Sequence, residues 1–142
     1  MKIITEFQGD YRFLSNFWPA SVMMHGLEYL SVEHAYQAAK TKDLAQREKI
    51  HLCVSPGQAK RMGRYVTIRP DWERIKLDTM THLVARKFKH PTLAKALLAT
   101  GDAELQEGNK WGDTYWGICN GRGENHLGKI LMAVRTELAN AR

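Results

Sequence analysis

The sequence predicts an α+β fold that is predominantly helical, with a small β-sheet, in a single domain that covers residues 1–142. Three observations support this prediction. A chain of 142 residues is long enough for one sizeable core. The first 30 residues alternate apolar and polar positions, whereas apolar residues recur at helical spacing in several segments after Ser31.

Residues 2–30 are expected to form short strands around a turn at His25-Gly26, because apolar residues flank that turn on both sides. A helix from Val32 to about Lys42 follows, with Ser31 as its N-cap. Ser55 is the predicted N-cap of a second, basic helix, which has proline at its first position and ends at Gly63.

The longest buried helix is predicted between Asp71 and Lys89, and His90-Pro91 ends it. Another helix is expected near residues 93–98, ending near Gly101, and a C-terminal helix begins near Asn125. Residues 104–124 mix acids, aromatics and glycines without a sustained period. This segment is typical of a functional loop, and its residues 104–119 are also expected to contribute to the small sheet.

Composition excludes several classes of protein. Hydrophobic residues at 44% and charged residues at 25% are ordinary globular usage, so disorder and fibrous repeats are not expected. No apolar run is long enough to span a membrane, and the acidic Glu6 interrupts any signal-peptide core. We therefore predict a cytoplasmic protein that has no membrane partner.

The cysteines and histidines form no motif that indicates a metal or a cofactor. Cys53 and Cys119 form no C-x-x-C pair, and the six histidines form no H-x-x-H set. We expect neither a metal nor a cofactor. The net charge of +6 favours phosphorylated or polyanionic partners.

The helix after Ser31 carries the first candidate for chemistry. Glu33, Gln37 and Lys40 are spaced i, i+4 and i+7, so they share one polar face. The helix dipole favours an ionised carboxylate in the first turn, which suits a base or a cation stabiliser. The alternative is that Glu33 only complements the helix end and forms a surface ion pair.

Two aromatic-rich strings are candidates for a binding pocket. Residues 7–19 place Arg12, Ser15 and Asn16 among aromatic rings, and residues 111–117 do the same for Asp113. Flat walls with a few directed polar groups suit a heterocycle attached to a sugar phosphate. The alternative is core packing, which we expect for Phe7, Leu14, Phe17 and Trp72 and leave open for Trp111 and Trp116.

Basic residues and glycines provide candidates for anion binding. Arg12, Lys60 and Arg61 are suited to a phosphate, although each alone is also typical of a solvated surface charge. The glycines of residues 121–128 lead into a helix N-terminus, where backbone N–H groups can hold an anion. A plain glycine turn followed by an Asn125 cap is the simpler interpretation.

Six ordered strings together resemble the NADAR family, also called YbiA-like, across nearly the whole chain. They are Arg12-Phe13-Leu14-Ser15-Asn16-Phe17, residues 31–40 (SVEHAYQAAK), Ser55-Pro56 with residues 59–64 (AKRMGR), Arg69-Pro70-Asp71-Trp72, Asp113-Thr114-Tyr115-Trp116-Gly117 and Asn125-His126-Leu127-Gly128. Many relatives have a shorter E-A-S-P-x-D-x-x-W-G segment, whereas five residues separate Glu107 from Asp113 here.

The resemblance implies N-glycosidase chemistry, in which Glu33 and Asp113 correspond to the catalytic acids. Members of the family hydrolyse phosphoribosylamino-pyrimidine intermediates of riboflavin synthesis, such as 5-amino-6-(5-phosphoribosylamino)uracil, or remove ADP-ribose from guanine in DNA. The resemblance implies substrate-binding roles for Lys60, Arg61, Trp72 and Trp116. The full set of candidate substrate-binding residues is Arg12, Ser15, Asn16, His34, Gln37, Lys60, Arg61, Trp72, Trp111 and Trp116.

The chemistry of the residues agrees with this implication. Breaking a ribosyl C–N bond builds positive charge on C1′ and the ring oxygen, so a fixed carboxylate such as Glu33 lowers the barrier and can activate water. The leaving heterocycle needs a proton donor or a hydrogen-bond partner, for which Asp113 is the candidate. The expected partner is a small phosphorylated riboside; ADP-ribosylated DNA and a non-catalytic module that binds ADP-ribose or nucleic acid are the alternatives.

Overall fold

The computed structural model describes residues 2–141 and divides the chain into two compact units. One unit is the continuous segment Asn16–Lys87, and the other combines the residues before Asn16 with those from Phe88 onward. Helices dominate and the strands are short, which confirms the predicted fold class. Within the described residues, no helix has the length and apolar character that crossing a bilayer requires.

The 16–87 unit begins with a β-hairpin of β2 (Val22–Met24) and β3 (Leu27–Tyr29). His25 and Gly26 form its turn with φ values of 52° and 80°, the left-handed conformation that two-residue hairpin turns need. Val22 pairs with Tyr29 in the antiparallel register, and both side chains are buried. The predicted strands and turn are confirmed here.

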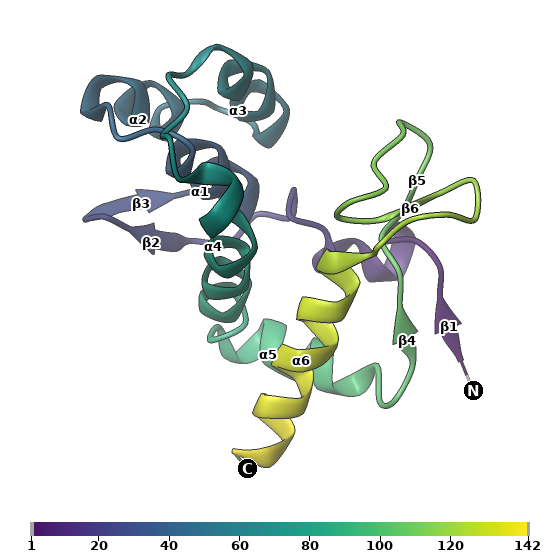
Figure 1. Ribbon diagram of the computed structural model, residues 1–142. Helices are drawn as coiled ribbons and strands as arrows, with labels where there is room; N and C mark the ends of the chain where they lie inside the picture. Colours follow the sequence, from purple (N-terminus) through teal and green to yellow (C-terminus); the bar gives the residue numbers. More distant parts are fainter. Residues whose placement is uncertain (1, 142) are drawn as a thin grey trace. The chain divides into compact units, whose positions relative to one another are not determined.

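Helix α1 (Val32–Ala39) follows the hairpin and lies at the centre of this unit. Ser31 caps it by accepting a hydrogen bond from the backbone N–H of His34, as predicted. The helix ends at Ala39 instead of Lys42, because the last turn tightens and Thr41 N donates to Ala38 O. The hairpin packs against α1, and so do α2 (Leu44–His51), α3 (Pro56–Met62) and α4 (Trp72–Lys87), so every residue of α1 is buried (Figure 1).

Helix α2 (Leu44–His51) was not expected from the sequence. Only Arg47 and Ile50 of this helix are buried, so it shows no apolar stripe. The available signal was its cap, because Asp43 accepts a hydrogen bond from Gln46 N at 2.9 Å.

Helix α3 (Pro56–Met62) has the predicted Ser55 cap and leads into a 3₁₀ turn, η2 (Gly63–Tyr65). Ser55 Oγ accepts from Gln58 N at 3.1 Å, and the Gln58 side chain accepts from the N–H of Val54. Helix α4 (Trp72–Lys87) is the long helix predicted from Asp71 to Lys89, and it ends before His90-Pro91. It buries Trp72, Met80, Leu83, Val84 and Lys87.

The second unit contains two pairs of short parallel strands. β1 (Ile3–Ile4) pairs with β4 (Glu104–Leu105), and β5 (Gly108–Asn109) pairs with β6 (Ile118–Cys119). The expected strand contribution of residues 104–119 is therefore confirmed. Between Gly9 and Leu14 the chain forms a 3₁₀ helix, η1, so the expectation of strands throughout residues 2–30 was wrong there. Gly9 breaks the extended run with a φ of 58°.

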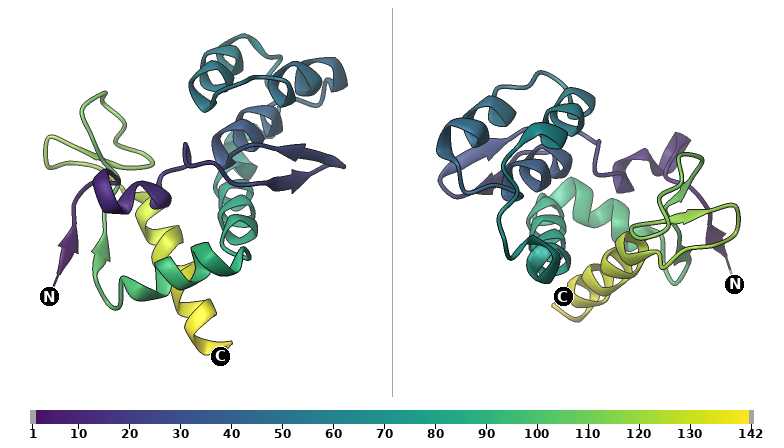
Figure 2. Two further views of the ribbon diagram at one scale, coloured as in Figure 1. Left: turned by 180° about the vertical axis from the view of Figure 1, so that it is seen from behind. Right: turned by 45° about the horizontal axis from the view of Figure 1, so that its top comes forward.

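Helices α5 (Pro91–Ala99) and α6 (His126–Asn140) cross each other in this unit (Figure 2). The predicted end of α5 near Gly101 and the predicted start of α6 near Asn125 are both confirmed. Asn125 occupies the N-cap position of α6, but its side chain makes no capping hydrogen bond, contrary to our prediction. Its amide instead donates to Leu105 O and accepts from Glu107 N, so it ties the start of α6 to the end of β4.

Candidate active site

The α1 polar face, which consists of Glu33, Gln37 and Lys40, lies in the 16–87 unit, where Glu33 and Gln37 are buried and Lys40 is half-buried. Glu33 is 8% exposed, and its Oε2 accepts a hydrogen bond of 2.6 Å from Gln37 Nε2. The alternative in which Glu33 forms an ion pair at the surface is therefore wrong. A carboxylate only accepts hydrogen bonds, so Gln37 must turn its NH₂ group toward Glu33 and its carbonyl oxygen away.

Gln37 is held from its other side by Gly63. A Cβ atom at position 63 would overlap Gln37 Oε1, so only glycine allows the end of α3 to approach this closely. The buried Oε1 has no hydrogen-bond partner within the described residues. A buried acceptor without a donor is uncommon, and a bound water or substrate hydroxyl is one way to satisfy it.

Aromatic rings lie beside Lys40, at the C-terminal end of the α1 polar face. Lys40 Nζ lies 5.6 Å from the centre of the Tyr36 ring, and Tyr36 packs against Trp72 at a centroid distance of 5.2 Å. Trp72 is 5% exposed, which agrees with the expectation that it belongs to the core. Burial lowers the pKa of Lys40, and the Glu33 carboxylate opposes this effect.

Three further cations act on Lys40. The positive charges of Lys60, Lys76 and Arg64 each lower its pKa, which means that they lie within electrostatic range of its ammonium group. Lys60 and Arg64 precede and follow Gly63, so the close contact of Gly63 with Gln37 brings this basic segment to the α1 polar face. We call Lys40, Lys60, Arg64 and Lys76 the cation cluster.

Asn16 and Phe17 lie at the start of α1. Asn16 O accepts a hydrogen bond from Glu33 N at 3.1 Å, and the Asn16 side chain donates to Met80 Sδ. Phe17 is 41% exposed, so the expectation that it packs in the core was wrong. Lys60 Nζ lies 6.0 Å from the centre of its ring, which brings Phe17 next to the cation cluster.

His34 has an internal partner on each ring nitrogen. Nε2 donates to Cys53 O at 3.1 Å, because a carbonyl can only accept, and Nδ1 then accepts from the Ser31 hydroxyl at 2.7 Å. Burial lowers the pKa of this imidazole. His34 also lines a mostly apolar cavity of about 420 Å³ together with Phe17, Leu30 and Val54.

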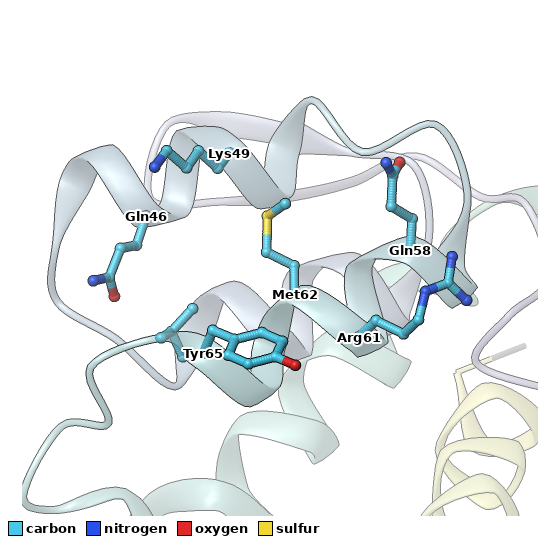
Figure 3. Close-up of a pocket in the computed structure, with 7 residues that line it drawn as sticks. Gln46, Lys49, Gln58, Arg61, Met62 and Tyr65 are labelled. Atoms are coloured by element: carbon cyan, nitrogen blue, oxygen red, sulfur yellow. The ribbon is translucent and has the colours of Figure 1, made fainter.

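Lys60 and Arg61 lie on different sides of α3. Lys60 acts on Lys40, whereas Arg61 acts on the thiol of Cys53 and lines a second cavity of about 420 Å³ (Figure 3). Adjacent helical residues project about 100° apart, so one basic string serves two surfaces. From the sequence alone, Lys60 and Arg61 are together candidates for binding one phosphate.

Asp113 lies in the other unit, in the loop between β5 and β6. Its Oδ1 accepts hydrogen bonds from the N–H groups of Tyr115 at 3.1 Å and Trp116 at 2.9 Å. Asn109 completes the loop, because its side chain accepts from Asp113 N and donates to Asp113 O. The Asp113 carboxylate thus orders the turn that carries Trp116.

The aromatic residues of this loop differ in burial. Trp116 is half-buried, and Tyr115 lies between it and His126 with ring centroids 4.8 and 4.5 Å away. Trp111 is 61% exposed, which rules out a core position for that residue. Arg12 is exposed on η1, and Ser15 N donates to Arg12 O at the end of that turn.

Glu107 packs so closely against position 117 that this position requires glycine. Glu107 Oε2 accepts from Asn109 Nδ2 at 3.0 Å, and a Cβ at position 117 would overlap this carboxylate oxygen. Glu107 is therefore part of the same loop network as Asp113, a connection that the sequence did not reveal. Within the described part of the chain, no group of three or more His, Cys, Asp or Glu side chains is arranged to hold a metal ion.

The structure places the sequence-derived site residues in two groups. Asn16, Glu33, His34, Gln37, Lys60, Arg61 and Trp72 belong to the 16–87 unit, and Arg12, Ser15, Trp111, Asp113 and Trp116 belong to the other. Sequence reasoning missed Gly63, Arg64 and Lys76. Gly63 and Arg64 belong to the AKRMGR string of residues 59–64, for which no contact with α1 was expected. Nothing in the spacing of that string indicates that Gly63 meets Gln37.

Comparisons with known proteins extend over nearly the whole chain. A family model described as the NADAR domain matches residues 5–139. An N-glycosidase of Nostoc punctiforme is 40% identical over 92% of this chain and 87% of its own length. N-glycosidase YbiA of Escherichia coli is 40% identical over 92% of this chain and 83% of its own length.

Two further similarities concern length and fold. A riboflavin biosynthesis protein of Vibrio vulnificus is 42% identical over 91% of this chain, but the chain spans only 36% of that protein. The NMR structure of the Escherichia coli protein YbiA superimposes with a TM-score of 0.88 at 37% identity, covering 99% of this chain and 86% of the other.

Proposed function

The chain belongs to the NADAR domain family, and we propose that this N-glycosidase hydrolyses the C–N glycosidic bond of a phosphoribosylated heterocycle. Residues 1–142 would act as one functional domain. The riboflavin biosynthesis protein of Vibrio vulnificus, at 42% identity, supports an intermediate of that pathway as substrate. 5-Amino-6-(5-phosphoribosylamino)uracil is the specific compound that we propose.

The observation that carries the proposal is the buried Glu33–Gln37 pair beside the cation cluster. The transition state of glycoside cleavage carries positive charge on C1′ and the ring oxygen. A carboxylate that is 8% exposed and oriented by an amide at 2.6 Å is suited to stabilise that charge. In the cation cluster Lys76 is paired with Glu73 at 2.8 Å, and Lys40, Lys60 and Arg64 are suited to hold the phosphate of the same substrate.

Gln37 has two roles in this proposal. Its NH₂ group fixes the orientation of Glu33, and its carbonyl oxygen, which has no donor within the described residues, accepts a hydrogen bond from the attacking water or a ribose hydroxyl. Glu33 then removes a proton from the water as the C–N bond breaks, and the departing nitrogen takes up a proton, from Asp113 or, where Asp113 only orders the loop, from solvent. The products are ribose 5-phosphate and the free amino-heterocycle.

Asp113 is the proposed partner of the leaving heterocycle. Its Oδ1 already accepts two backbone N–H groups, so its carboxylate serves first to order the loop that carries Trp116. Trp116 is half-buried and suited to stack on the heterocycle. Whether Asp113 also donates a proton is tested by the Asp113→Asn variant described below.

The test is hydrolysis of the phosphoribosylamino-pyrimidine, followed as released ribose 5-phosphate. We expect turnover by the unchanged protein and a loss of about 10²- to 10⁴-fold in kcat for Glu33→Gln. Glu28→Gln is the matched control, because Glu28 is an exposed glutamate of the β-hairpin in the same unit. Equal rates for Glu33→Gln and Glu28→Gln would refute the role of Glu33.

An oligonucleotide that carries ADP-ribosylated guanine, offered beside the free metabolite, tests the alternative substrate. Preferential release of ADP-ribose would replace the small-molecule proposal. Contact with several DNA phosphates should also weaken steeply with added salt, whereas a pocket for one phosphate should respond less.

A further inference from the structure

A trough lies between α2 and the segment formed by α3 and η2. It encloses about 420 Å³, within the range of small-ligand pockets. Figure 3 shows Lys49 at one end and Arg61 at the other, with Met62 and Tyr65 between them. We call this cavity the α2–α3 trough.

The middle of the trough presents a flat apolar surface. Tyr65 is 85% exposed although its ring lines the cavity, and Met62 extends toward the same space. An exposed aromatic ring beside a thioether is suited to stack against a heterocycle. A core role does not account for Tyr65, because the rest of the molecule hardly covers it.

The ends of the trough are positively charged. Neither Lys49 nor Arg61 forms a salt bridge with any described residue. Residues 16–87 hold 12 of the 21 Lys and Arg but only 7 of the 15 Asp and Glu, so five of the six surplus positive charges lie in this unit. The charge therefore favours an anionic ligand, and a guanidinium matches a phosphate with two parallel hydrogen bonds.

The walls of the trough are held in place by hydrogen bonds. The Gln46 carboxamide accepts from Thr41 Oγ1 and Thr67 N and donates to Thr67 Oγ1, which ties α2 to the segment after η2. Gln58 Oε1 accepts from Val54 N at 2.9 Å and fixes the start of α3. A pocket with fixed walls loses little conformational entropy when a ligand binds.

We propose that the α2–α3 trough is a nucleotide-binding site, in which the base stacks on Tyr65 beside Met62 and the phosphate binds Arg61. Lys49 supplies a further donor at the opposite end. This site is separate from the α1 polar face, because none of Glu33, Gln37 and Lys40 lines the trough. Nucleotide binding here does not depend on the hydrolysis proposed above.

The test is a calorimetric titration with 5′-AMP, adenosine and inorganic phosphate as separate probes. The Glu33→Gln protein is used beside the unchanged protein, so that cleavage of the probe cannot distort the titration. We expect saturable binding of 5′-AMP to both proteins, and binding of adenosine and of phosphate that is at least about tenfold weaker. Tyr65→Ala and Arg61→Gln should each weaken 5′-AMP binding roughly tenfold.

Arg74→Gln is the matched control for charge, because Arg74 lies on α4 with a side chain that is 79% exposed. It should leave the affinity unchanged. Backbone amide shifts of residues 46–66 should move with 5′-AMP in the protein and should need a higher nucleotide concentration to move in Tyr65→Ala, which is expected to fold because Tyr65 is so exposed.

Three outcomes would overturn the nucleotide site. They are unaltered affinity of Tyr65→Ala, equal weakening by Arg74→Gln and Arg61→Gln, and amide shifts confined to residues 33–40. If the unchanged protein binds 5′-AMP but releases no ribose 5-phosphate from the phosphoribosylamino-pyrimidine, only the proposed hydrolysis is overturned.

Discussion

Replacing Lys87 by Met is expected to stabilise the protein and to change how its stability depends on pH. Lys87 is the last residue of α4 and is 1% exposed. Burial lowers the pKa of its ammonium from 10.5 to about 7. Met keeps an unbranched side chain of similar length and removes the group whose charge opposes burial.

The expected magnitude follows from these two pKa values. Between pH 7 and 10.5 the unfolded chain holds a proton that the folded chain lacks, so folding loses about 1.4 kcal/mol for each pH unit below 10.5. The cost is absent above pH 10.5, grows as the pH falls, and levels off below pH 7 at about 5 kcal/mol. Lys87→Met should therefore raise the free energy of unfolding most at pH 7.

The assay is urea unfolding of the unchanged protein and Lys87→Met, followed by circular dichroism at pH 7, 8 and 9. The advantage of the variant should fall from about 5 kcal/mol at pH 7 to about 2 kcal/mol at pH 9. Lys89→Met is the control, because Lys89 is exposed and should show a difference that does not vary with pH. A constant advantage, or a variant that is less stable throughout, would refute the reasoning.

Three further predictions concern the site and its support. Gly63→Ala places a Cβ against Gln37 Oε1, so we expect a lower kcat with a preserved circular dichroism spectrum, and unchanged turnover would contradict the proposed contact. His34→Gln should reduce the dependence of the free energy of unfolding on pH. Burial lowers the pKa of His34, so the neutral imidazole contributes its full stability above pH 6.5 and this contribution is lost as the pH falls. Urea midpoints at pH 7.5 and 5 would measure the difference. Asp113→Asn keeps the Oδ1 acceptor for Tyr115 N and Trp116 N but cannot act as an acid; retained turnover assigns Asp113 to loop order, and a loss of about 10²-fold or more assigns it proton donation.

Local chemistry explains the parts of the fold that the sequence predicted well. The caps at Ser31 and Ser55 depend only on the residues that follow within one turn, and both are observed. The turn at His25-Gly26 is equally local. Helix α2 escaped prediction because only Arg47 and Ile50 are buried, so packing around Ile50, and not an apolar stripe, holds it.

Tertiary contacts explain the parts that the sequence could not predict. The Glu33–Gln37 hydrogen bond follows from i, i+4 spacing and was within reach. The contact of Gln37 with Gly63 joins segments 26 positions apart, and no periodicity encodes it. A tertiary contact also explains Asn125. Its side chain hydrogen-bonds the backbone at Leu105 and Glu107, at the end of β4, and makes no capping hydrogen bond to α6.

The pairing of β1 with β4 has a consequence for synthesis on the ribosome. Ile3 is translated before the 16–87 unit, but its partner Glu104 is translated only after the whole of that unit. The 16–87 unit can therefore fold first, and β1 stays unpaired until β4 has been synthesised. A nascent chain arrested before β4 should already protect α1 from proteolysis and leave the first residues open to cleavage.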